Sequence, residues 1–226
     1  MINSMSARIE QSLAADGAIA CFSSNFFPSV WMLIAAAEGR RWVPGFRRES
    51  SLMSREVTTS LTRAALIVTL CWLSMIGCDF LLHGGLLATF YVQPSPFLLP
   101  LKQAFRLIPL GYVSFLLLAI LLVWLMLRLD VRGGRGGIIF GVKLGALIWG
   151  ALVLGLMSIS TASAGLLAGW FVGQTIELGV AGAFAGGALG GARLTRLFMT
   201  VIALIFFSIL ITIALQSLGL APSVRM

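Results

Sequence analysis

The feature that most constrains this chain is a series of five apolar segments, each more than 20 residues long. A helix needs about 20 consecutive apolar residues to cross the hydrocarbon core of a bilayer. Charged residues make up only 11% of the chain, against about 25% in ordinary soluble domains. The sequence therefore predicts an all-α fold, a polytopic bundle of transmembrane helices. The predicted spans are residues 63–89, 107–129, 137–161, 165–190 and 197–218.

The residues outside these spans divide the chain into three parts. Residues 1–61 are predicted to be a basic N-terminal arm, partly disordered or lying at the membrane interface, because the apolar stretch 26–37 is too short to span. Residues 62–218 form the predicted bundle, and residues 219–226 form a short tail. Two interpretations of the arm stay open. Either it is cytoplasmic with an interfacial helix, or the native protein starts near Met53, where a long apolar run follows.

Basic residues lie mostly at the ends of the apolar segments and account for the net charge of +8. This placement favours contact with anionic lipid head groups and argues against nucleic acid as a partner. With the N-terminus inside, the inner side receives the arginines of the arm and of the turns at 128–135 and 193–196. The opposite side receives only Lys102, Arg106 and Arg225. The positive-inside rule therefore predicts an N-in, C-out topology.

Glycines repeat every four residues in the third and fourth spans, which places them in stripes where another helix can approach closely. The link at 158–163 is short, so these spans are predicted to form an antiparallel hairpin. The fourth span carries two stripes on different sides, which indicates that it packs between neighbours. The glycines predicted to pack helices, within the chain or against a homo-oligomeric or other membrane-protein partner, are Gly137, Gly141 and Gly145 in the third span and Gly165, Gly169, Gly173, Gly182, Gly186 and Gly190 in the fourth.

The second span has no internal charge and is predicted to face lipid. The first and fourth spans, in contrast, contain ionisable side chains. Asp79 and His83 are four residues apart and share a helix face, as do Gln174 and Glu177, which are three apart. Counting from the outer helix ends at 1.5 Å per residue places all four roughly 9 to 18 Å deep. The sequence therefore predicts that these four residues form one intramembrane polar network.

Three interpretations of this network compete. The first is structural, because polar groups in hydrocarbon must hydrogen-bond across helices. The second is a proton or ion relay in a small transporter or channel, since Asp, Glu and His line such paths. The third is a divalent metal site, which the presence of a single histidine weakens. Cys71 and Cys78 project about 110° away from the Asp79–His83 direction, at about 100° per residue, and are poor candidates to complete a ligand set.

The sequence favours a structural or accessory role, with the transporter or channel as the alternative. No Walker loop, HExxH, GxSxG or dinucleotide-binding fingerprint occurs. Two serines, Ser114 and Ser158, are candidate nucleophiles, but neither has a base positioned to activate it. We therefore predict no catalytic residue, no cofactor and no resident metal, and an enzyme is the less favoured class.

The sequence pattern around the polar residues resembles a pattern found in other membrane proteins. The stretch Asp79-x-x-x-His83-Gly-x-Leu86-Leu87-x-x-x-Tyr91, with the later Trp170-x-x-x-Gln174-x-x-Glu177, resembles a group of small bacterial polytopic membrane proteins. The resemblance extends over residues 54–218. It implies a multi-pass protein of the bacterial inner (plasma) membrane in which the polar positions belong together. It carries no activity with it.

Overall fold

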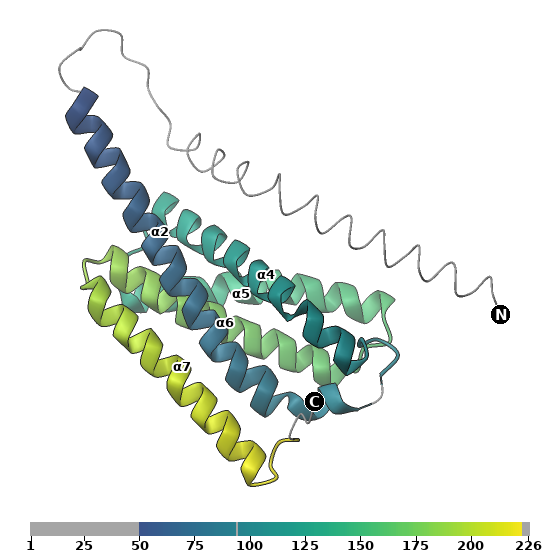
Figure 1. The fold of residues 1–226 in the computed structure, drawn as a ribbon. Coiled ribbons are helices and arrows are strands. Elements are labelled where there is room, and N and C mark those ends of the chain that lie inside the picture. Colours follow the sequence, from purple (N-terminus) through teal and green to yellow (C-terminus); the bar gives the residue numbers. More distant parts are fainter. Residues whose placement is uncertain (1–49, 94, 223–226) are drawn as a thin grey trace, which may run out of the picture. The chain divides into compact units, whose positions relative to one another are not determined.

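The computed structural model describes residues 50–93 and 95–222, which form the long helices of Figure 1. Within these residues the fold is all-α, as predicted, with six α-helices and one short π-helix. The elements in chain order are α2 (Ser50–Leu81), η1 (Leu82–Leu86), α3 (Ala88–Val92), α4 (Leu101–Arg128), α5 (Gly134–Ile159), α6 (Ala164–Leu189) and α7 (Leu194–Ser217). The predicted arm lies outside the described residues up to position 49, and its last residues, 50–61, belong to α2.

Five helical segments are long and apolar enough to cross a membrane, so the predicted multi-pass class and the number of spans are confirmed. The spans are Leu61–Leu86, Gln103–Arg128, Gly134–Ile159, Ala164–Leu189 and Leu194–Ser217. Their ends differ from the predicted ends by a few residues. Helix α4, which contains the second span, begins at Leu101, earlier than predicted. Pro100 directly precedes it, at a position where the missing proline N–H costs no helical hydrogen bond, and Pro109 lies inside the helix.

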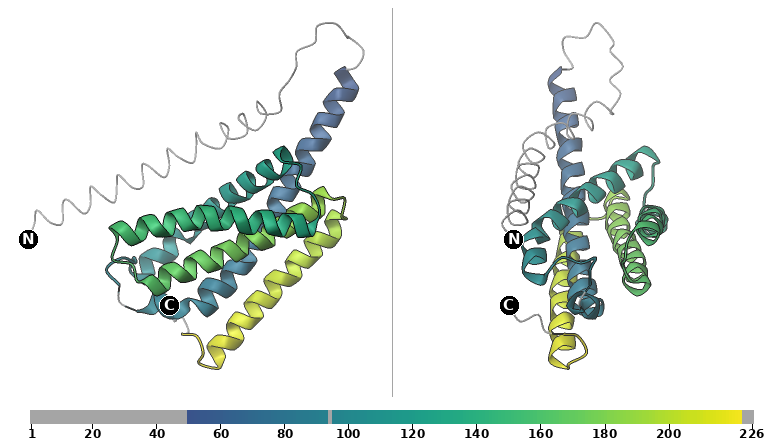
Figure 2. Two further views of the ribbon diagram at one scale, coloured as in Figure 1. Left: turned by 180° about the vertical axis from the view of Figure 1, so that it is seen from behind. Right: turned by 90° about the vertical axis from the view of Figure 1, so that its right-hand side faces the viewer.

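Helices α5 and α6 pack backbone against backbone in an antiparallel hairpin, seen side by side in Figure 2. A methyl group on Gly137 would overlap the carbonyl oxygen of Gly182, and a methyl on Gly182 would overlap that of Gly137. Gly186 meets the Gly133 carbonyl in the same way. The N–H of Gly133, a residue with a φ of 81°, donates to the Gly186 carbonyl at 2.8 Å. At these three glycines the contacts leave no room for a side chain between the two helices.

The other glycine stripe of α6 packs against the C-terminal end of the first span. A methyl group on Gly173 would lie 3.3 Å from the Leu82 side chain, and one on Gly165 would lie 3.1 Å from Phe90. Gly169, between them, is contacted by the Leu87 side chain. Helix α6 therefore lies between α5 on one side and the η1–α3 segment on the other. This packing brings the first and fourth spans into direct contact.

The prediction that the second span faces lipid is wrong for one side of α4. Ala119, Leu122 and Met126 are completely buried and join the apolar core that α2 and α6 also build. Trp124 and Leu127, on the opposite side of the helix, stay exposed. Between Leu107 and Leu127 the sequence of α4 contains no charged residue, so charge does not mark which side packs inward.

The first span does not continue as an α-helix to its end. Between Leu82 and Leu86 it widens into a π-helical turn, closed by a 2.7 Å bond from the Leu87 N–H to the Leu82 carbonyl five residues earlier. Helix α7 supplies donors to the carbonyls around this turn. The Thr212 hydroxyl lies 3.1 Å from the Phe80 carbonyl, and the Gln216 amide donates to the Gly84 carbonyl at 3.1 Å.

Replacing Gln216 with leucine is expected to lower the free energy of unfolding by about 1 kcal/mol, because the Gly84 carbonyl then loses its donor from α7. Unfolding of the detergent-solubilised protein in SDS measures this change. Ser217→Ala is the control, since the exposed Ser217 hydroxyl donates to the Ile213 carbonyl of its own helix and, among the described residues, to no other helix. Equal stability of the two variants would mean that the α7 contact does not hold the π-helical turn.

Candidate functional site: an intramembrane polar cluster

The polar residues of the first and fourth spans lie at the contact just described. Asp79 lies near the end of α2, and His83 lies four residues later within the π-helical turn. Gln174 and Glu177 lie on the side of α6 that continues the Gly165–Gly173 stripe and are both buried. Because π-helical turns are rare and often occur at functional sites, the placement of His83 within one draws attention to this cluster.

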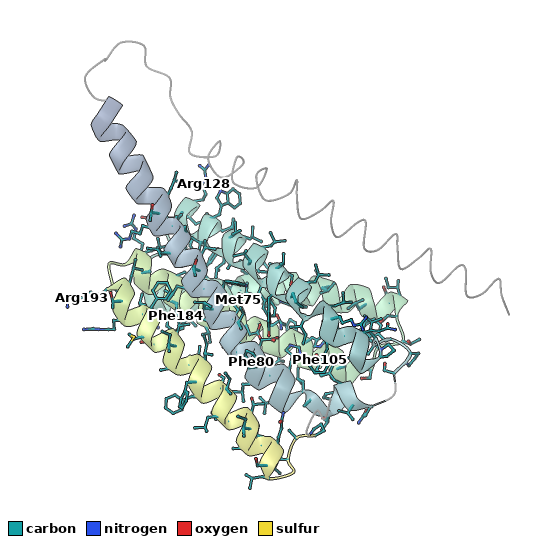
Figure 3. The ribbon with its side chains drawn as sticks, in the orientation of Figure 1. Met75, Phe80, Phe105, Arg128, Phe184 and Arg193 are labelled. Atoms are coloured by element: carbon teal, nitrogen blue, oxygen red, sulfur yellow. The ribbon has the colours of Figure 1, made fainter. Side chains whose placement is uncertain are left out.

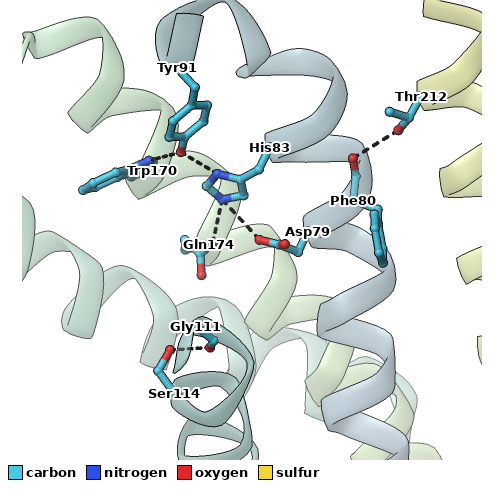
Figure 4. Close-up of polar contacts among 9 residues, drawn as sticks. All are labelled: Asp79, Phe80, His83, Tyr91, Gly111, Ser114, Trp170, Gln174 and Thr212. Atoms are coloured by element: carbon cyan, nitrogen blue, oxygen red, sulfur yellow. Dashed lines mark hydrogen bonds and ion pairs between the residues drawn. The ribbon is translucent and has the colours of Figure 1, made fainter. Parts of the chain in front are cut away.

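His83 is the centre of the hydrogen-bond chain shown in Figure 4. Its Nδ1 lies 2.5 Å from the Tyr91 hydroxyl, and its Nε2 lies 3.1 Å from the Gln174 amide nitrogen. The Asp79 Oδ1 lies 3.4 Å from the same Nε2. The Trp170 indole N–H donates to the Tyr91 hydroxyl at 2.6 Å. The chain thus joins the end of the first span to α6 through four side chains.

Tyr91 and Trp170 fix the orientation of the imidazole ring. Burial raises the pKa of the Tyr91 phenol, so its hydroxyl keeps its proton at neutral pH. An indole N–H can only donate, so Trp170 ties the Tyr91 oxygen to α6. With Nδ1 engaged by Tyr91, Nε2 is the ring nitrogen directed at Asp79 and Gln174.

Glu177 is the one carboxylate of the cluster without a bond. Its side chain is 0% exposed, and neither carboxylate oxygen has a hydrogen-bond partner among the described residues. A carboxylate oxygen of Glu177 lies close to the other two ionisable groups of the cluster. This oxygen, a carboxylate oxygen of Asp79 and a ring nitrogen of His83 all lie within 4.8 Å of one another. Burying a polar group without a partner costs about 1–3 kcal/mol, and more for a charge. This carboxylate is therefore an energetic liability in the absence of a cation or proton.

The predicted network residues are placed as follows. Asp79 and Gln174 both contact His83, whereas Glu177 lies beside them with no hydrogen bond to any described residue. Cys71 lies elsewhere, with its thiol donating to the Ala181 carbonyl at 3.4 Å. The Oε1 atom of Gln174 also has no partner in the part of the chain that the structure describes.

Tyr91 and Trp170 belong to the pattern on which the resemblance rests, but the sequence did not place them in the predicted network. Tyrosines near the ends of spans commonly lie at the membrane interface, where they need no partner within the bundle. The structure uses its hydroxyl to connect His83 with Trp170. The signal that could have found both residues is helical spacing, because Trp170 precedes Gln174 by one turn and Tyr91 follows His83 by about two.

No protein-family model, curated protein or solved structure matches this chain. The resemblance to small bacterial membrane proteins therefore has no matching family behind it. The functional interpretation of the protein therefore rests on the chemistry of the polar cluster.

Proposed function

We propose that this membrane protein binds a cation inside its helix bundle and couples that binding to ion movement across the membrane. The observation that carries this proposal is Glu177, fully buried and with no hydrogen-bond partner among the described residues. A cation beside this carboxylate offsets the cost of burying it. Ionisable side chains within membrane spans are typical of ion pathways.

A structural or accessory role is the second candidate. The chain of bonds from Trp170 through Tyr91 and His83 to Gln174 favours it, because this chain joins two spans that are distant in sequence. A structural network is most stable when every buried member is satisfied. Glu177 does not meet that condition, and for this reason we prefer the cation-binding function.

We further propose the N-in, C-out orientation in a bacterial inner membrane, with lipids as immediate partners. Arg63 donates to the Ala188 carbonyl at 3.1 Å, and Gly133 donates to Gly186, so the start of the first span and two basic turns lie at one end of the bundle. Figure 3 labels Arg128 and Arg193 near this end. Collected positive charge is typical of the cytoplasmic side.

Single cysteines test this orientation in a background from which Cys21, Cys71 and Cys78 have been removed. On intact cells, a membrane-impermeant maleimide is expected to label Thr161→Cys and to leave Arg132→Cys unlabelled. Both positions should react after permeabilisation, since both side chains are exposed. The reverse pattern on intact cells would contradict the proposed orientation.

Flux measurements in proteoliposomes test the function. Vesicles containing the protein are expected to show proton or cation flux down an imposed gradient, above that of protein-free vesicles. Glu177→Gln should abolish the flux because it removes the unpaired carboxylate while keeping its shape. Thr175→Val is the matched control. Thr175 lies on the same helix, and its buried hydroxyl also has no hydrogen-bond partner among the described residues, but its backbone packs against Gly145 of α5. Absence of wild-type flux, or full flux in Glu177→Gln, would overturn the proposal.

A further inference from the structure

We propose that the cation is a first-row divalent transition metal such as Zn²⁺, bound by Asp79, His83 and Glu177. The inference rests on the proposed function and names the ligand of the same site. The sequence by itself predicted no metal here, because the presence of a single histidine weakens that interpretation of the network. The structure adds that the three side chains converge from two spans and that the Glu177 carboxylate has no hydrogen-bond partner within residues 50–93 and 95–222.

The distances suit a small metal ion. Zinc binds imidazole nitrogen and carboxylate oxygen at about 2.0–2.2 Å, so two of its ligands in tetrahedral geometry lie about 3.4 Å apart. His83 Nε2 and Asp79 Oδ1 are 3.4 Å apart. All three donor atoms lie within 4.8 Å of one another, so a small change in the Glu177 side chain closes the set.

The charges of the donor set also suit a divalent ion. Two carboxylates and a neutral imidazole together carry the charge that one divalent cation neutralises. Among the described residues, neither Asp79 nor Glu177 forms an ion pair with a lysine or arginine. A bound metal would supply the missing positive charge at a depth where an unpaired charge is costly. The imidazole nitrogen favours a transition metal over Ca²⁺ or Mg²⁺, which prefer oxygen ligands.

The residues around the ligands have the arrangement expected of a metal site. A metal-binding histidine usually engages its second ring nitrogen in a hydrogen bond that fixes the ring. Here Tyr91 occupies Nδ1 and is itself tied to Trp170. Gln174 contacts Nε2 and must turn aside to admit the metal, after which its unpartnered Oε1 can serve as a fourth ligand. Tyr91 is therefore a positioning residue.

Calorimetric titration of the full-length protein with Zn²⁺ alone, in detergent and with an affinity tag free of histidine, tests the site. We expect one Zn²⁺ per chain, and loss of that binding in Asp79→Asn and Glu177→Gln. Tyr91→Phe should weaken the affinity about 10- to 100-fold. Thr175→Val should bind as the wild type does. Wild-type affinity in Glu177→Gln would overturn the inference.

A second measurement needs no variant, because His83 is the only histidine in the chain. Zn²⁺ is expected to protect His83 from modification by diethyl pyrocarbonate in the wild-type protein, whereas Ca²⁺ at the same concentration should not. Unchanged modification in the presence of Zn²⁺ would overturn the metal site. Zn²⁺ binding without any flux would support the site and contradict the proposed function. Flux of protons or monovalent ions without Zn²⁺ binding would support the function and contradict the metal.

Discussion

Replacing Gly137 with alanine is expected to prevent the α5–α6 hairpin from closing and to lower the free energy of unfolding by more than about 3 kcal/mol. Overpacked side chains cost about 1–3 kcal/mol because they can rotate or shift. The added methyl group at Gly137 meets the carbonyl oxygen and carbon of Gly182 instead, and backbone atoms cannot rotate away. The two helices must therefore move apart along their whole contact. Unfolding in SDS and the melting temperature in detergent measure the loss.

Gly155→Ala is the matched control for this prediction. Gly155 lies on the same helix, and a methyl group added there would meet no atom within 4 Å. We expect this variant to be as stable as the wild type or slightly more stable, because alanine is the better helix former. If both variants had the same stability, the backbone contact between α5 and α6 would not exist in the membrane protein.

Replacing Glu177 with methionine is expected to stabilise the metal-free protein by about 1–3 kcal/mol and to abolish cation binding. Methionine has a similar shape and removes a buried carboxylate that has no hydrogen-bond partner among the described residues. Functional sites commonly keep such destabilising groups, so gains of stability with loss of function are expected there. The free energy of unfolding and the Zn²⁺ titration, measured on the same preparation, check both parts.

The direction of the stability change separates the two candidate functions. If Glu177 belonged to a satisfied structural network, methionine would break its bonds and lower the stability. Gln174→Met provides the comparison, because it removes a contact to His83 that the structure does contain. We expect Gln174→Met to be less stable than Glu177→Met. The opposite order would favour the structural role.

The spans and the two sides of α6 could be predicted because both depend on local periodicity. Apolar length sets the number of spans. Glycines spaced by four residues lie on a common face of the helix. The stripe that contains Gly182 packs against α5, and the stripe that contains Gly173 packs against Leu82 on a different side of α6. The estimate of depth in the membrane also needed only local information, namely the rise per residue along each helix. It placed Asp79, His83 and Gln174 at similar depths, and in the structure Asp79 and Gln174 both contact His83.

The features that sequence reasoning missed depend on contacts between distant segments. The buried side of α4 is set by the neighbours of Leu122 and not by its own uniformly apolar pattern. The π-helical turn is accompanied by bonds from Thr212 and Gln216, more than 100 residues away in the chain. Likewise, no spacing rule reveals that Glu177 has no hydrogen-bond partner in the described part of the chain, because that depends on every side chain packed around it.

The close pairing of α5 and α6 has a consequence for how the protein is made. Helix α6 is the least apolar of the five spans and has the largest buried share, so lipid alone offers it the least stabilisation. Only four residues separate it from the more apolar α5. We expect the two helices to leave the translocation machinery together as one preassembled unit during biosynthesis. Lengthening the 160–163 link should then delay membrane integration of α6 while leaving that of α5 unchanged.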